Sequence, residues 1–145
     1  MTQAEQIVAS ARKAIGTKWV HQGRSEDGLD CAGLVIKIGN ELGLLDWDIK
    51  DYERKASMSA MLDICREHLT EIPRVALQPG DLVVLRFKDT NHIGIIGDYP
   101  HGGLSIIHAQ ATAPRRVGEN RFCDDWMKLI GCRLAGCFRF PERVR

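Results

Sequence analysis

The sequence lacks the features that would place a protein in a membrane or on nucleic acid. No apolar run approaches the roughly 20 residues that span a bilayer, so we expect no membrane insertion. The 20 Lys and Arg side chains nearly balance the 19 Asp and Glu side chains, and this balance predicts no nucleic-acid partner. Residues 1–6 carry neither the positive charge nor the apolar stretch of a secretory signal. The sequence therefore predicts synthesis in the cytoplasm without a signal peptide.

Patterns typical of disulfide frameworks and metal sites are also missing. The 5 cysteines are an odd number, and the sequence has no Cys-x-x-Cys pair and no His-Glu-x-x-His helix. Cys123, Cys132 and Cys137 could be combined into a zinc site, but their spacing matches none of the common zinc motifs. The sequence therefore favours free thiols, with no metal and no cofactor.

The chain of 145 residues, with 44% hydrophobic content, predicts a single domain over residues 1–145. Apolar residues recur at helical spacing in the first half, and strand-like apolar runs follow in the second half. The predicted helices cover 2–15, 31–42 and 57–69, and the predicted strands cover 82–87, 93–96, 104–109, 115–117 and 134–140, with a helical turn at 124–129. Helices followed by strands indicate an α+β fold with an antiparallel sheet.

Cys31 lies where a polar loop meets the second predicted helix, which places it in the first helical turn. Unpaired N–H groups and the positive end of the helix dipole favour a thiolate there, and the thiolate is the reactive form of cysteine. A nucleophilic cysteine also needs a base, and His92 on a predicted strand could supply it. The alternative is a core thiol on the apolar face of the helix. Position alone does not decide between the two.

A predicted hairpin brings a second histidine into the argument. If strands 93–96 and 104–107 pair around a loop centred on Pro100, His92 lies directly opposite His108 on the same face. Two imidazoles in this arrangement can act as a base and the group that holds its tautomer. A one-residue bulge would instead send the rings to opposite faces of the sheet.

Several short motifs occur in a fixed order along the chain. They are Gly16-Thr17-Lys18-Trp19, Gly23, Asp30-Cys31-Ala32-Gly33-Leu34-Val35, Pro79-Gly80-Asp81-Leu82, His92-Ile93-Gly94-Ile95 and Ile106-Ile107-His108-Ala109. In combination they resemble the NlpC-type cell-wall cysteine peptidases, and the resemblance extends over about residues 5–140. Because the cysteine precedes the histidines, the chain resembles the unpermuted branch of that family.

The resemblance implies a papain-like fold, in which N-terminal helices pack on a central, barrel-like antiparallel sheet. It implies a catalytic triad of Cys31, His92 and His108. It also implies cleavage of peptidoglycan stem peptides, typically between γ-D-glutamate and diaminopimelate or lysine, without a metal or cofactor. A thiolate–imidazolium pair of the papain type would lower the pKa of Cys31 far below that of an ordinary thiol.

Two positions depart from the family pattern, and both concern substrate contacts. Trp19 stands where the family usually has tyrosine, and its indole N–H can donate a hydrogen bond but cannot accept one. Ala32 replaces the serine whose hydroxyl helps to hold the stem peptide. Asp30 is retained and, by resemblance, could pair with the amine of an N-terminal L-alanine. We therefore predict Trp19, Asp30 and Ala32 as substrate-binding residues.

Chains this short, without a signal or wall-binding module, resemble those of phage tails and gene-transfer agents. This predicts association with a virion or tail and, as further partners, other tail proteins. Two alternatives to the peptidase remain. The domain could serve as an interaction module in tail assembly, or it could be an amidase or acyltransferase that uses the same triad on another acyl donor.

Overall fold

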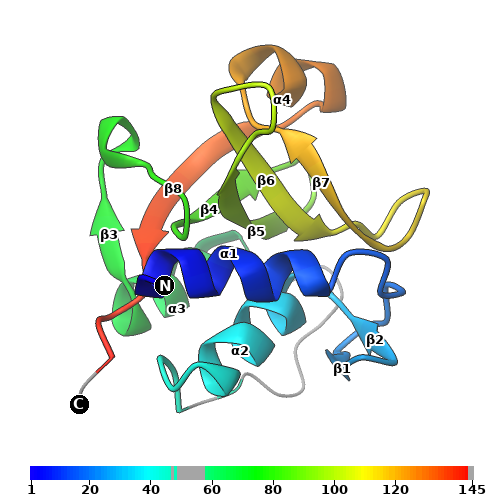
Figure 1. Cartoon of the computed structure of the whole chain (residues 1–145). Coiled ribbons are helices and arrows are strands. Elements are labelled where there is room, and N and C mark those ends of the chain that lie inside the picture. The colour runs from blue at the N-terminus through cyan, green and yellow to red at the C-terminus, as the bar shows by residue number, and fades with distance from the viewer. Residues whose placement is uncertain (47, 49–57, 144–145) are drawn as a thin grey trace.

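The computed structural model describes residues 1–46, 48 and 58–143 of the chain. In chain order the elements are α1 (Gln3–Lys13), β1 (Arg24–Ser25), β2 (Gly28–Leu29), α2 (Cys31–Glu41), α3 (Met58–His68), β3 (Thr70–Ile72), the 3-10 helix η1 (Arg74–Ala76), β4 (Leu82–Arg86), β5 (Asn91–Asp98), β6 (Leu104–Ala109), β7 (Val117–Arg121), α4 (Asp124–Ile130) and β8 (Arg133–Arg139). Helices α1, α2 and α3 lie on one side of the large sheet, and α4 lies beyond its other side (Figure 1). The predicted α+β class is confirmed.

The large sheet is antiparallel, with its strands in the order β3-β8-β4-β5-β6-β7. Among the described residues, β3 pairs only with β8 and β7 pairs only with β6, so the two edge strands do not meet. The predicted barrel-like closure is therefore wrong. Closure needs a hydrogen-bonded partner strand on both sides of every strand. Strand β3, with 3 residues, has such a partner on one side and ends the sheet.

Both faces of the sheet are buried, which explains the unbroken apolar run of β4. Leu82 and Val84 pack in the core beneath α1 and α2, whereas Val83 and Leu85 pack in a second cluster that includes Met127 of α4. These four side chains of β4 have an exposed fraction of 0%. A strand that alternates between two apolar clusters shows no polar alternation in its sequence.

The helices start close to the predicted residues because their caps are encoded locally. Thr2 and Glu5 form a reciprocal capping box at α1, and Asp30 caps α2 so that its first residue is Cys31. The predicted start of the third helix at Ser57 lies outside the described residues. None of the helices in residues 1–46 and 58–143 is both long and apolar enough to cross a bilayer.

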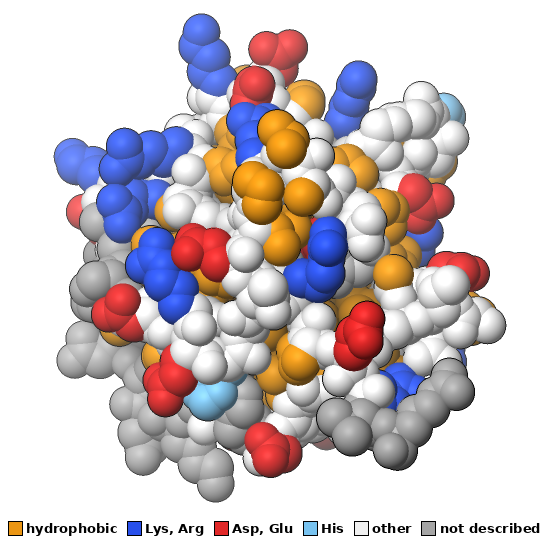
Figure 2. All heavy atoms as spheres, turned by 90° about the vertical axis from the view of Figure 1, so that its left-hand side faces the viewer, with side chains coloured by type: hydrophobic (Ala, Val, Ile, Leu, Met, Phe, Trp, Pro, Cys, Tyr) orange, Lys and Arg blue, Asp and Glu red, His pale blue; other side chains and the backbone are white. Residues whose placement is uncertain are grey.

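The sequence prediction is less accurate for the short or polar strands. Strand β7 begins at Val117, where the predicted strand 115–117 ends, and the pair β1–β2 and strand β3 were not predicted. These segments have two to five residues, and β1, β3 and β7 contain charged side chains, so their periodicity is weak. On the face in Figure 2, acidic and basic side chains are interspersed around exposed apolar ones, in line with the balanced charge of the chain.

Candidate active site

The first turn of α2 fixes the position of Cys31. The Asp30 carboxylate caps the helix by accepting the N–H of Gly33 at 2.7 Å, and it also accepts the N–H of Gln22 at 2.8 Å. A side chain at Gly33 would place its Cβ 2.0 Å from the carbonyl oxygen of Gly23. Only glycine therefore fits at this position, where the loop that precedes the helix packs against its first turn.

His92 and His108 meet through a direct hydrogen bond. Nε2 of His92 lies 2.7 Å from Nδ1 of His108, and the two rings are 4.9 Å apart at 73° to each other. The register differs from the prediction by two residues, because Ile95 pairs with Ile107 and the next pair places Gly94, not His92, beside His108. A shift of two residues keeps both histidines on the same face, so the predicted contact forms diagonally across the strands.

A third polar side chain continues this contact onto the edge strand. Nε2 of His108 lies 2.8 Å from Oδ1 of Asn120 in β7, so His92, His108 and Asn120 form one hydrogen-bonded row across three strands. Asn120 was not predicted as a site residue. The predicted strand over 115–117 stopped before it, and β7 contains no apolar alternation that would have revealed its register.

Two glycines make room for this row of side chains. His108 has Gly118 as its direct neighbour on β7 and, by the continued register, Gly94 as its neighbour on β5. A Cβ on Gly94 would lie 2.6 Å from Cγ1 of Ile106 and 3.2 Å from Cβ of His108. With no side chain directly beside it on either strand, His108 reaches diagonally to His92 and to Asn120.

This packing gives a first testable prediction. Gly94→Ala should lower the free energy of unfolding by about 1–3 kcal/mol, because the added methyl group overpacks the interior against Ile106 and His108. Gly118→Ala is the matched control, since its Cβ meets only the flexible end of Gln110, at 2.8 Å. Urea denaturation of both variants measures the difference. Equal stability losses would contradict the assigned role of Gly94.

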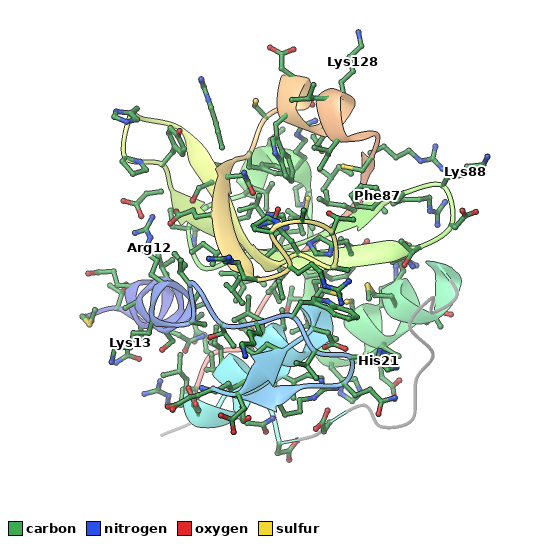
Figure 3. All side chains as sticks on the ribbon, turned by 90° about the vertical axis from the view of Figure 1, so that its right-hand side faces the viewer. Arg12, Lys13, His21, Phe87, Lys88 and Lys128 are labelled. Atoms are coloured by element: carbon green, nitrogen blue, oxygen red, sulfur yellow. The ribbon has the colours of Figure 1, made fainter. Side chains whose placement is uncertain are left out.

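The cleft around Cys31 has a volume of about 750 Å³ and contains every residue that the sequence analysis placed in the site. Its lining joins Trp19 and His21 of the N-terminal loop, the start of α2, helix α3, the row of His92, His108 and Asn120, and Trp126 of α4. Figure 3 shows the side of the molecule where the labelled His21 lies beside the helices and the labelled Phe87 lies in the connection between β4 and β5. Within the described part of the chain, no cluster of three or more His, Cys, Asp or Glu residues could hold a metal ion.

The three predicted substrate-binding residues line the cleft in different environments. Trp19 is half-buried, with the Arg115 guanidinium 5.5 Å above its ring and the His21 ring stacked nearby at 6.4 Å. Ala32 lies in the first turn of α2. Asp30 is 4% exposed, and its oxygens accept hydrogen bonds from the protein itself, including one from Arg24 at 3.2 Å. A structural role of Asp30 as a helix cap was not part of the sequence prediction.

The electrostatics of Cys31 and His92 differ from the prediction. Burial raises the pKa of the Cys31 thiol to about 11, and this effect outweighs the backbone N–H of Ile93, which points at the sulfur and lowers the pKa. Burial, followed by repulsion from His108, lowers the pKa of His92 to about 3. The predicted low pKa of Cys31 is therefore wrong for this arrangement. The positive end of the helix dipole favours the thiolate, but removing the charged sulfur from water costs more.

The low pKa of His92 predicts a loss of stability in mild acid. The unfolded chain binds a proton at His92 near the ordinary value of 6.5, whereas the folded chain does not until about pH 3. Stability must therefore decrease as the pH falls through this window, by about 2 kcal/mol between pH 7 and pH 5. Urea denaturation at both pH values measures this loss.

The variant His92→Gln, which cannot titrate, serves as the control. It should lose less stability than the parent between pH 7 and pH 5. Burial also lowers the pKa of His108, so this second histidine adds to the acid sensitivity and some of it should persist in the variant. A parent protein that is as stable at pH 5 as at pH 7 would contradict a neutral, buried His92.

Comparisons with known proteins identify the family and similar folds. Residues 16–128 match the NlpC/P60 family. The fold is similar to the NlpC/p60 domain of the peptidoglycan hydrolase SagA, with 21% identity and a TM-score of 0.62 over 94% of this chain and 98% of that domain. It is also similar to NlpC2 from Trichomonas vaginalis, with 22% identity and a TM-score of 0.69 over 95% of this chain.

A third similar structure is an NLP/P60-family protein from Staphylococcus aureus that is described as similar to a lipoprotein, with 20% identity and a TM-score of 0.64 over 97% of this chain. The chain spans 46% of the Trichomonas protein and 42% of the Staphylococcus protein. The comparison with curated proteins gives no match. None of these comparisons bears on the phage-tail affiliation, which stays a prediction. The family match covers most of the sequence and includes Cys31, His92 and His108, so the chain belongs to the NlpC/P60 family.

Proposed function

We propose that this chain is a cysteine peptidase that hydrolyses peptide bonds in the stem peptides of peptidoglycan. The observation that carries the proposal is that Cys31 and the hydrogen-bonded pair His92–His108 line the same cleft. A sulfur nucleophile, a ring nitrogen able to take its proton and a second ring that orients the first are the parts that such a reaction needs. The family membership supports the same class of reaction.

The proposed reaction starts from a neutral Cys31 thiol and a neutral His92 imidazole. His92 takes the thiol proton as the Cys31 sulfur attacks the amide carbonyl, and a tetrahedral oxyanion forms. His92 then gives this proton to the departing amine, which leaves a thioester on the sulfur. Water attacks the thioester, releases the carboxylic acid and restores the thiol. His108 accepts the Nε2–H of His92 throughout, so that only Nδ1 of His92 exchanges protons.

Substrate recognition is assigned to the residues at the mouth of the cleft. The indole N–H of Trp19 and the backbone N–H of Cys31 are proposed to stabilise the oxyanion, since both residues line the cleft. Asp30 and Ala32 line the neighbouring wall, where Asp30 is proposed to bind the amine of an N-terminal L-alanine. The bond that fits this assignment joins γ-D-glutamate to diaminopimelate or lysine.

Digestion of defined muropeptides tests the proposal. The intact protein is incubated with purified stem peptides of known sequence, and mass spectrometry identifies the products. Release of diaminopimelate- or lysine-containing fragments from γ-D-glutamate supports the proposal. Cleavage at another bond would correct the specificity, and intact muropeptides after long incubation would argue for a different acyl substrate.

The lining of the cleft supports a second candidate, an amidase or acyltransferase that acts on an apolar acyl group. Apolar side chains from α2, from α3 and the residue after it, and from the β4–β5 connection line the cleft, and they include Val35, Ile36, Met61, Ile64, Leu69 and Phe87. No lysine or arginine is found among the described residues of the lining. Long-chain N-acyl amides, incubated in parallel with the muropeptides, separate the two candidates by which acyl group is released.

A further inference from the structure

Asn120 has no assigned role, yet it ends the hydrogen-bonded row that begins at His92. We propose that Asn120 is a positioning residue that sets the direction of this row, and through it the tautomer in which His92 can act as a base. This proposal rests on the proposed cysteine-peptidase reaction. The Asn120 side chain is half-buried, and its Oδ1 lies 2.8 Å from Nε2 of His108.

The direction of each hydrogen bond follows from the chemistry of the atoms. An amide oxygen can only accept, so Nε2 of His108 must carry a proton and donate it to Oδ1 of Asn120. A neutral imidazole has one N–H, so Nδ1 of His108 is then an acceptor. The bond of 2.7 Å between the rings therefore requires that Nε2 of His92 donates. Nδ1 of His92 therefore keeps its lone pair, and this is the nitrogen that must receive the thiol proton.

The opposite direction would leave the site without a base. If each hydrogen bond of the row were donated in the opposite direction, from Asn120 toward His92, His108 would donate through Nδ1 and Nε2 of His92 would accept. His92 would then carry its proton on Nδ1 and could not take another from Cys31 without becoming charged. Burial opposes that charge, because it lowers the pKa of His92 to about 3. The acceptor at the end of the row thus decides which of two neutral arrangements is present.

Packing around His108 holds the ring in line with Asn120. The Trp126 ring meets His108 edge-on, with the centroids 5.7 Å apart and the planes at 83°. Gly94 and Gly118, the cross-strand neighbours of His108, carry no side chain of their own that would press on the ring. The hydrogen bond to Asn120 also raises the pKa of His108 against the larger effect of burial, as expected for an acceptor that favours the protonated ring.

Two nearly isosteric replacements test the proposal. Asn120→Leu removes the acceptor, so kcat for the muropeptide should fall by about 10- to 100-fold with KM changed by less than about 3-fold. Asn120→Asp keeps an atom that can only accept, so kcat should stay within about 3-fold of the parent at pH 8. The negative charge of the introduced carboxylate favours a doubly protonated His108, whose ring can no longer accept the hydrogen bond from Nε2 of His92. The acid limb of the pH–rate profile should therefore shift upward by about one unit.

A spectroscopic measurement tests the same proposal without any substrate. Protein labelled with ¹⁵N-histidine should show His108 and His92 protonated on Nε2 at pH 7.5 in the parent and in Asn120→Asp. In Asn120→Leu, the two tautomers of His108 should be mixed. If no muropeptide or acyl amide is cleaved by the parent, the proposed reaction fails, and these spectra still decide the role of Asn120.

A control on the same strand separates positioning from stability. Glu119 is the chain neighbour of Asn120, and it binds Arg12 at 2.8 Å and Ser105 at 2.6 Å. Glu119→Gln should therefore lower stability while leaving the pH–rate profile and the histidine tautomers unchanged. The proposal is overturned if Asn120→Leu keeps the kcat and the spectrum of the parent. It is also overturned if folded Asn120→Asp is as inactive at pH 8 as Asn120→Leu.

Discussion

Replacement of Cys31 by alanine should lower the turnover of muropeptides by roughly 10⁴-fold or more, with the fold preserved. The sulfur carries the proposed bond to the substrate, so its loss removes the reaction path itself. The other thiol of the cleft, Cys65, cannot take over. It lies on α3, and burial raises its pKa to about 12. The stability of the variant should change by about 1 kcal/mol or less, because the substitution removes one sulfur atom from a residue that is only half-buried as a whole.

Cys65→Ala is the matched control for this experiment. It also removes a sulfur from the lining of the cleft, but from a position that the proposed reaction does not use. Product formation is followed by mass spectrometry for both variants, and circular dichroism checks the fold. Full activity should persist in Cys65→Ala. If Cys31→Ala turned over muropeptides as fast as Cys65→Ala does, the nucleophile would have to be assigned elsewhere.

The helices and the histidine pair could be predicted because their signals are local. The capping box of Thr2 and Glu5 and the cap of Asp30 fix two helix starts within a few residues of sequence. Alternation in the apolar strands placed His92 and His108 on one face. The exact register could not be predicted, because it depends on the conformation of the Gly-rich hairpin loop. The predicted register was wrong by two residues. It still placed both histidines on the correct face of the sheet, but it gave the wrong direct neighbour for each.

The properties that the sequence could not reveal depend on tertiary burial. The first turn of a helix lowers the pKa of an exposed thiol. The sulfur of Cys31 is enclosed, and desolvation raises its pKa by more than the helix dipole lowers it. The position of Asn120 depends on how β7 pairs with β6, which places His108 beside Gly118. Neither fact can be derived from local periodicity. Both change how the proposed chemistry works.

Replacement of His92 should have the second-largest effect, a loss of about 10²- to 10⁴-fold in kcat. His92 both receives the thiol proton and returns it to the departing amine, so His92→Ala removes two functions. The sulfur must then lose its proton to water, and burial raises its pKa to about 11. The residual rate should therefore increase by about tenfold per pH unit from neutral to alkaline pH. The parent should keep a flat profile over neutral pH, because its His92 is neutral there.

His108 supplies the graded control for this prediction. His108→Asn should keep a measurable part of the activity, because its amide oxygen can still accept the Nε2–H of His92 if it reaches the same position. His108→Ala offers no acceptor and should fall between His108→Asn and His92→Ala. Rates for the three variants are compared across the pH range on one muropeptide. A His92→Ala profile as flat as that of the parent would show that another group takes the thiol proton. Parent-like activity in His108→Ala would show that the row of side chains does not orient His92.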